Sequence, residues 1–124
     1  MQDKRVLVVD DEEFNCLLIE MAFEDTYSVQ SVFSGQDCLR ASTAYNPDVV
    51  LLDINMPGMT GIEVCKQLKS SPETQDIPVI FVSALESQEI KTEAKKAGGI
   101  DYFTKPIDPD ELVNRVDLIF SEPS

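Results

Sequence analysis

The 124-residue sequence has no histidine and only three cysteines, and these absences exclude several kinds of catalytic site. Without histidine, Ser-His-Asp and Cys-His catalysis are not available, and a zinc site is not expected. The cysteines form no Cys-x-x-Cys pair. We therefore expect Cys16, Cys38 and Cys65 to be buried thiols that pack as small apolar side chains.

Positive charge and long apolar runs are also scarce. The 10 Lys and Arg residues face 23 Asp and Glu residues, giving a formal net charge of −13 that opposes direct binding to nucleic acid. No apolar run approaches the ~20 residues that cross a bilayer, and no signal-peptide stretch follows the N-terminus. We therefore expect a cytoplasmic protein with no membrane partner, folded as one domain.

The apolar pattern alternates five times between short runs and helix-spaced stripes, which predicts an α/β fold. Strands are expected at residues 5–9, 27–33, 48–53, 78–83 and 100–104, and each is followed by a helix. Short connections between five βα units favour a doubly wound, five-stranded parallel sheet between two layers of helices. This domain should cover residues 1–120, with 121–124 as a tail or the start of a linker.

Two of the expected helices carry features that matter later. In the first, Phe14, Leu17, Leu18 and Met21 recur at helical spacing, so we expect this face against the sheet. The fourth, at residues 86–96, has few apolar residues and should be weakly held. Gly98 follows it and predicts a left-handed cap.

Charged and hydroxyl side chains follow four of the five predicted strands. Asp10 and Asp11 come after the first, Asp53 after the third, Ser83 ends the fourth, and Lys105 follows the fifth. Ligands of such sheets bind at the carboxyl ends of the strands. Taken singly, the aspartates and Ser83 could be helix caps or strand ends, and Lys105 a surface charge. Taken together, clustered carboxylates without His or Cys predict a site for Mg²⁺.

This grouping suggests phosphoryl chemistry. A carboxylate beside Mg²⁺ and a lysine can attack phosphorus, which would make Asp53 the nucleophile and its product an aspartyl phosphate. The metal and Lys105 would neutralise charge on the transferred oxygens, and Ser83 would donate a hydrogen bond to them. No glycine-rich phosphate-binding loop follows the first strand, where the chain is acidic instead.

The sequence also resembles the receiver domain of two-component response regulators over nearly its whole length. Four motifs, at residues 8–11, 51–61, 82–84 and 97–106, follow the family pattern in order at four strand ends. With this resemblance we expect a flavodoxin-like fold of strand order 2-1-3-4-5. The resemblance implies a phosphorylation-activated switch that catalyses only its own phosphotransfer and dephosphorylation, and so is not an enzyme acting on a separate substrate.

The resemblance also assigns roles around the phosphoacceptor. It implies that Asp53 accepts a phosphoryl group from a sensor histidine kinase or a histidine phosphotransfer protein. It further implies that Asp11, Asp53 and the main-chain carbonyl of Asn55 bind Mg²⁺, with Asp10 helping through water. A cis peptide bond between Lys105 and Pro106 is expected as well.

A second set of implied roles concerns the response to phosphorylation. Ser83 and Lys105 match the switch hydroxyl and lysine of the family, and Tyr102 matches its aromatic switch position. We expect Ser83 to move toward the phosphoryl oxygens and Tyr102 to turn inward, changing the face made by the fourth helix, the fifth strand and the fifth helix. This face would control a downstream effector protein, a C-terminal output domain or a homodimer.

Two other functions share this architecture. One is a Mg²⁺-dependent phosphatase that acts on small substrates through an aspartyl phosphate, as in enzymes that resemble the haloacid-dehalogenase group. Such an enzyme would need a proton donor at position 55, where this chain has Asn55. A flavin-binding module is opposed by the acidic first loop. The sequence does not name the kinase, the output pathway, the phosphoryl lifetime or the oligomeric state. It is equally compatible with a stand-alone receiver and with one domain of a longer chain.

Overall fold

In the computed structural model, which describes residues 4–121, strands and helices alternate along the whole chain. The strands are β1 Arg5–Val9, β2 Ser28–Val32, β3 Val49–Leu52, β4 Val79–Ser83 and β5 Asp101–Thr104. The helices are α1 Glu13–Phe23, α2 Gly35–Ala44, α3 Gly61–Lys69, α4 Gln88–Ala97 and α5 Pro109–Ser121. Ser121, which the sequence assigned to the tail, is thus the last residue of α5, and 122–124 lie outside the described residues.

The five strands form one parallel sheet in the order β2-β1-β3-β4-β5, which confirms the predicted fold. Strands β3 and β4 are buried along their whole length, as expected from the apolar runs at 49–52 and 79–82. The edge strand β2 has alternating polar residues and is only partly covered. Asp53 and Ser83 therefore lie at the ends of fully buried strands, whereas Lys105 follows the partly buried edge strand β5.

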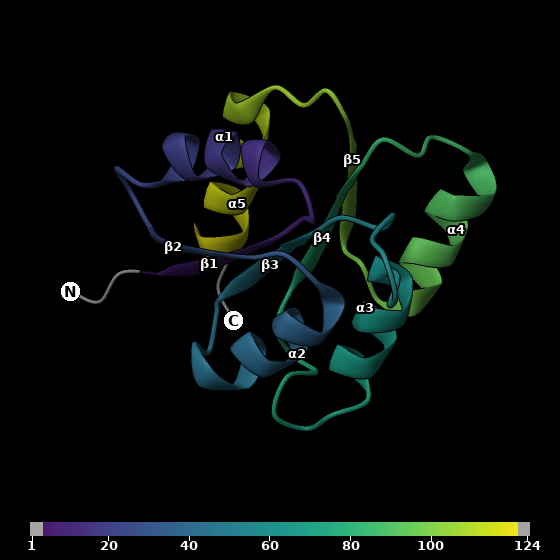
Figure 1. The fold of residues 1–124 in the computed structure, drawn as a ribbon. Coiled ribbons are helices and arrows are strands. Elements are labelled where there is room, and N and C mark those ends of the chain that lie inside the picture. Colours follow the sequence, from purple (N-terminus) through teal and green to yellow (C-terminus); the bar gives the residue numbers. More distant parts are fainter. Residues whose placement is uncertain (1–3, 122–124) are drawn as a thin grey trace.

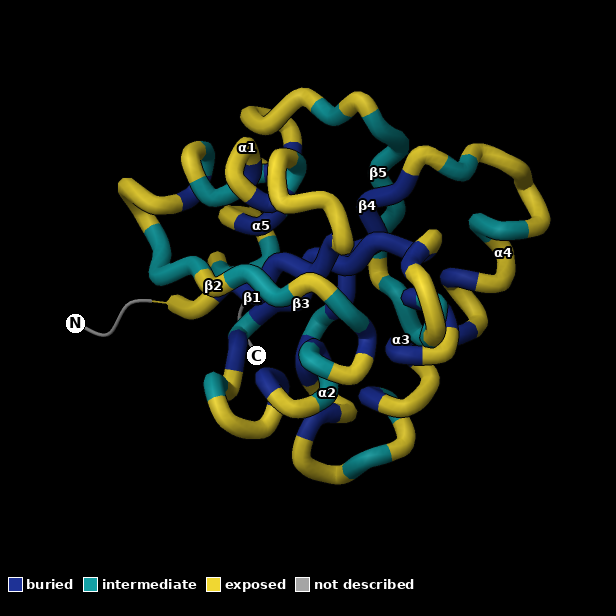
Figure 2. The backbone as a smooth tube through the Cα atoms, viewed as in Figure 1, coloured by how far each residue is buried: buried dark blue, intermediate teal, exposed yellow. Residues whose placement is uncertain are grey.

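Helices cover both faces of the sheet: α1 and α5 lie on one side, and α2, α3 and α4 on the other (Figure 1). Each side has its own apolar core. The core under α1 and α5 contains residues such as Val8, Ile80 and Leu112, whereas that under α2, α3 and α4 contains Leu52, Cys65 and Phe81. Figure 2 shows these buried strands at the centre, surrounded by exposed helix surface. All three cysteines are buried and free, as predicted.

Helix α1 presents the opposite face to the one that the sequence predicted. Its buried residues are Cys16, Ile19 and Phe23. The predicted core stripe is instead exposed, with relative exposures of 69% for Phe14, 51% for Leu17, 44% for Leu18 and 59% for Met21. Helix α1 is apolar on two faces, so periodicity alone could not choose between them.

Helix α4 is held by few apolar contacts, as expected from its sequence. Only Ala94 and Ala97 are buried among its ten residues. Ser87 caps its N-terminus through the main-chain N–H of Ile90, and Gly98 ends it in the left-handed conformation at φ 117°. Across residues 4–121, no helix combines the length and the apolar character needed to cross a membrane.

Candidate functional site

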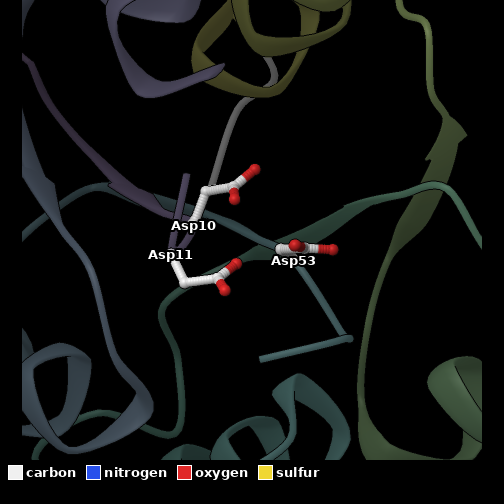
Figure 3. Close-up of side chains that lie close together, drawn as sticks. All are labelled: Asp10, Asp11 and Asp53. Atoms are coloured by element: carbon white, nitrogen blue, oxygen red, sulfur yellow. The ribbon is translucent and has the colours of Figure 1, made fainter. Parts of the chain in front are cut away.

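Three carboxylates meet at the carboxyl edge of the sheet. Asp10 and Asp11 follow β1, and Asp53 follows the neighbouring strand β3. One oxygen from each lies within 4.8 Å of the others, and Figure 3 shows the three side chains directed toward one space. Asp10 and Asp53 are 3% and 5% exposed, whereas Asp11 is open to solvent. The predicted convergence of these residues is therefore present.

Main-chain contacts hold Asp53 in place. Its N–H donates to the carbonyl oxygen of Val9 at 2.9 Å, and its side-chain Oδ1 accepts from the N–H of Ile54 at 2.8 Å. Helix α3 begins against this segment at Gly61, where a Cβ would lie 2.0 Å from the Asp53 carbonyl oxygen. The backbone at position 61 thus lies too close to Asp53 for any side chain, which explains why a glycine stands there. The sequence motif at residues 51–61 includes this glycine but gives no reason for it.

Lys105 reaches into the carboxylate cluster from the end of β5. Its Nζ lies 2.7 Å from Oδ2 of Asp10 and 3.4 Å from Oδ2 of Asp53. Asp10 is thus the nearer partner of Lys105, although the sequence singled out Asp53 as the nucleophile. The main-chain N–H of Lys105 donates to the carbonyl oxygen of Ser83 at 2.9 Å, and the Lys105–Pro106 peptide bond is cis.

Burial and charge shift the protonation of this cluster. Burial raises the pKa of Asp53, and the negative charge of Asp10 adds to this, while Lys105 opposes it. Burial by itself would lower the pKa of Lys105. Its hydrogen bond to Asp10 and the negative charges of Asp53 and Asp10 outweigh that effect, so the pKa of Lys105 is raised. The ammonium therefore remains charged and fixed beside the carboxylates.

The residues present fit a hard divalent cation. Three carboxylates face one ammonium, which leaves an excess of negative charge, and all the converging ligand atoms are oxygens. This combination suits Mg²⁺, which takes carboxylate oxygens and keeps several waters. Asn55 is exposed in the loop two residues after Asp53 and is not part of the carboxylate cluster; its predicted ligand is a main-chain carbonyl.

Ser83 and Tyr102 meet at Leu85, in the loop between β4 and α4. Ser83 is fully buried, and its Oγ accepts from the N–H of Leu85 at 3.3 Å. The Tyr102 hydroxyl donates to the carbonyl oxygen of Leu85 at 2.6 Å, and its ring lies 6.3 Å from that of Phe81. No sequence signal could identify Leu85 as the link, because every residue offers the same main-chain groups.

The ordinary roles considered for single residues do not match this geometry. The N-cap of α1 is Glu12 rather than Asp10 or Asp11, and the N-cap of α4 is Ser87 rather than Ser83. The Lys105 side chain is 17% exposed and ion-paired, so it is not a solvated surface charge. Asp10 keeps one local role, because its Oδ1 accepts a hydrogen bond from the main-chain N–H of Glu12 at 2.9 Å.

Comparison with known proteins agrees with the fold and the site. Residues 6–117 match the family described as the response regulator receiver domain. The chain is 40% identical over 113 residues to the response regulator PleD of Caulobacter vibrioides, covering 90% of this chain but only 25% of that protein. It is 34% identical over 118 residues to protein PilH of Pseudomonas aeruginosa, covering 94% of this chain and 98% of that one.

Solved structures give the same assignment. The receiver domain of the Francisella response regulator 1452 superposes with a TM-score of 0.87 at 36% identity, covering 95% of this chain and 97% of that one. The sequence match spans the sheet, the carboxylate cluster and Lys105. The chain therefore belongs to the response regulator receiver domain family.

Proposed function

We propose that this chain is a phosphorylation-dependent signalling switch whose phosphoacceptor is Asp53. The observation that carries the proposal is the position of Asp53 between Lys105 and the carboxylates of Asp10 and Asp11. Keeping the Asp53 carboxylate ionised while it is buried beside other carboxylates costs free energy, as its raised pKa indicates. The arrangement becomes favourable when a divalent cation and a phosphoryl group complete it.

The donor in this proposal is a phosphohistidine of a sensor kinase or phosphotransfer protein. A carboxylate oxygen of Asp53 forms the new O–P bond, the P–N bond breaks, and its electron pair returns to the imidazole of the donor. Mg²⁺ bound by Asp11, Asp53 and the Asn55 carbonyl, with Asp10 assisting, would supply neutralising charge for the phosphoryl oxygens. Lys105 supplies the second positive charge from its position 3.4 Å from Asp53.

The switch follows from the charge that phosphorylation adds. An aspartyl phosphate brings roughly −1.5 to −2 charge and three acceptor oxygens to the end of β3. Ser83 then exchanges its bond with the Leu85 N–H for one to a phosphoryl oxygen. Tyr102, bonded to the carbonyl of the same Leu85, responds to this movement. The change reaches the face formed by α4, β5 and α5.

Two surfaces of the molecule support partner binding. The exposed apolar face of α1, with Phe14 and Leu17, adjoins a groove of about 400 Å³ lined by Leu18, Ile107 and Lys105. An exposed apolar face beside the phosphoacceptor suits the docking of the phosphodonor protein. The face of α4, β5 and α5 is left for a downstream effector, an output domain or a second copy of the chain.

The remaining assignments complete the proposal. The receiver domain, which extends through Ser121 at the end of α5, acts in the cytoplasm, and the chain catalyses only its own phosphorylation and dephosphorylation. The chain spans 25% of PleD but 98% of PilH, so relatives include both long proteins and single domains. No direct nucleic-acid binding is expected at a net charge of −13.

The decisive experiment maps phosphorylation by mass. The protein is incubated with acetyl phosphate, with and without Mg²⁺, and the modified residue is identified by mass spectrometry. We expect one Mg²⁺-dependent phosphoryl group, located on Asp53. Asp53→Asn should abolish it, and Asp11→Ala and Lys105→Ala should weaken it.

Asp25→Asn is the matched control, because Asp25 is an exposed aspartate away from the carboxylate cluster. It should be labelled like the wild type. Labelling of another residue, or labelling that survives Asp53→Asn, would refute the assignment. Sustained multiple turnover of a small phosphate ester would point instead to the phosphatase alternative.

A further inference from the structure

The ring of Tyr102 has a cationic neighbour on helix α4. The ammonium of Lys91 lies over this ring, 5.7 Å from its centroid. This distance is within the range of a cation–π interaction, in which the ring's quadrupole attracts the positive charge. Lys91 is half-buried, so solvent screens this contact less than it would screen a fully exposed lysine.

Lys91 has no competing ionic partner among residues 4–121, where four ion pairs are found and none includes it. Its side chain instead lines a cavity of about 240 Å³ between α4 and β5, together with Phe81, Lys95, Gly99 and Tyr102. Lys95 lies one helical turn further along the same cavity wall but is not stacked on an aromatic ring within the described residues. The two lysines therefore share the cavity wall but differ in their contact with the Tyr102 ring, which only Lys91 makes among the described residues.

Tyr102 is otherwise held by two contacts. Its ring packs against Phe81 of β4, and its hydroxyl donates to the carbonyl oxygen of Leu85. Both contacts tie Tyr102 to β4 and the loop that follows it. Lys91 adds the contact that ties Tyr102 to α4.

This contact matters because α4 has little else to fix it. Its buried side chains are two alanines, Ala94 and Ala97, both in its C-terminal half. Alanine buries little apolar area, and in the N-terminal half of α4 the partly buried Ile90 supplies the packing on the core. The interaction of Lys91 with Tyr102 lies in this loosely held half.

We propose that Lys91 is a positioning residue that keeps the Tyr102 ring in its half-buried orientation and thereby couples α4 to the phosphoacceptor site. The coupling to phosphorylation rests on the proposed function, whereas the contact itself does not. A movement of Tyr102 then changes the setting of α4, and a partner that displaces Lys91 loosens Tyr102. The direction of influence is reciprocal, as for any coupled equilibrium.

The first test is NMR of protein carrying ¹³C-labelled tyrosine rings. The chain has three tyrosines, and Tyr27→Phe and Tyr45→Phe identify the Tyr102 signal. Lys91→Met keeps the length of the side chain but removes its charge, so the Tyr102 signal should shift, and the ratio of the half-buried orientation to other orientations should fall by about two- to fivefold. Lys91→Arg keeps the charge and should restore the wild-type signal.

Lys95→Met is the matched control and should leave the Tyr102 signal unchanged. An unchanged Tyr102 signal in Lys91→Met, or an equal shift in Lys95→Met, overturns the proposal. Unfolding curves from circular dichroism verify that the variants fold, and the Tyr27 and Tyr45 signals should stay in place in all of them.

The second test measures coupling, using beryllofluoride with Mg²⁺ as the phosphoryl mimic. Lys91→Met should bind the mimic about two- to fivefold more tightly than the wild type and Lys95→Met, because Lys91 holds Tyr102 in the orientation that it leaves when it turns inward. Weaker binding would contradict this direction. Equal binding in all three would overturn the coupling. Acetyl phosphate labelling of Asp53 in the wild type separates the two proposals. Absence of labelling refutes the proposed function, while the Tyr102 signal still reports on the Lys91 contact.

Discussion

Gly61 gives the site an unusual sensitivity to a single methyl group. A Cβ at this position would lie 2.0 Å from the carbonyl oxygen of Asp53, so Gly61→Ala must displace either the start of α3 or the phosphoacceptor segment. We expect a loss of about 1–3 kcal/mol in the free energy of unfolding and slower labelling of Asp53. Urea unfolding and acetyl phosphate labelling measure the two effects.

Asp53→Asn provides the comparison for Gly61→Ala. It abolishes labelling but retains the main-chain contacts of residue 53, so its stability should not fall. If Gly61→Ala keeps wild-type stability and labelling, the backbone around Asp53 and Gly61 can move to accept a methyl group at little cost, and this prediction is wrong.

The buried thiols predict how stability depends on pH. Burial raises the pKa of Cys38 from an ordinary value of 9.0 to about 12. Between pH 8 and 10 the unfolded chain therefore loses this proton while the folded chain keeps it, and the free energy of unfolding falls as the pH rises. We expect Cys38→Ala to remove about 1–2 kcal/mol of this fall, measured by urea unfolding at the two pH values. Parallel losses in wild type and variant would contradict the shift.

At the level of single residues, the sequence could predict those parts of the candidate site in which a particular side chain supplies the functional group. Asp10, Asp53, Ser83 and Lys105 were predicted as site residues because strand ends gather functional groups, and Lys105 does lie beside Asp10 and Asp53. The preference of Lys105 for Asp10 depends on differences below 1 Å, since the two distances are 2.7 and 3.4 Å. Contacts of that precision arise from packing and leave no pattern in the sequence.

Among the elements, helix α1 has two apolar faces with different uses. The face with Ile19 packs on the sheet, whereas the face with Leu17 is exposed. We therefore expect Ile19→Ala to lower the free energy of unfolding by about 2–5 kcal/mol, as for other core truncations. Leu17→Ala should change it by less than about 0.5 kcal/mol. Thermal or urea unfolding of the two variants gives the comparison.

The same pair of variants tests the role of the exposed face. With a phosphorylated donor protein, Leu17→Ala should slow phosphotransfer to Asp53, while its labelling by acetyl phosphate stays normal. A variant that loses both activities equally would indicate damage to the site rather than to docking. If Leu17→Ala proves as destabilising as Ile19→Ala, the orientation of α1 described above is wrong.

The error in predicting α1 differs from the success with α4. Helix α4 is polar except for a narrow face with the buried Ala94 and Ala97, and Gly98 marks its end. The sequence of α1, EFNCLLIEMAF, supports two apolar stripes. Hydrophobic periodicity identifies a helix but not its rotation, unless one face is clearly polar.

At the scale of the whole molecule, the net charge of −13 makes cation binding depend on salt. We expect Mg²⁺ at 100 times its dissociation constant to stabilise the fold by about 2.7 kcal/mol. Raising NaCl from about 0.05 M to about 0.5 M should weaken Mg²⁺ affinity, because salt screens the negative potential that attracts the ion. Isothermal titration calorimetry and thermal unfolding measure both effects.

Variants distinguish the site from general attraction by the acidic surface. Asp11→Asn and Asp53→Asn should lose most of the Mg²⁺-dependent stabilisation, whereas Asp25→Asn removes the same charge elsewhere and should keep it. If all three variants lose it to the same extent, the ion is held by overall charge and not by the carboxylate cluster.

The overall architecture was the most predictable feature of the chain. Each βα unit carries its own signals, from the apolar run at Arg5–Val9 to Pro109 in the first turn of α5. Once five such units are recognised, handedness and short connections leave few topologies. Details that depend on contacts between distant elements, such as Lys91 over Tyr102, required coordinates.

The ion pair between Asp10 and Lys105 joins residues 95 positions apart in the chain. A ribosome must therefore release almost the entire domain before the lysine can meet its carboxylate partners. Prematurely terminated copies that lack β5 would also lack Lys105, and β4 would lose its partner strand. We therefore expect such truncated copies to fold poorly and to be phosphorylated more weakly than complete ones.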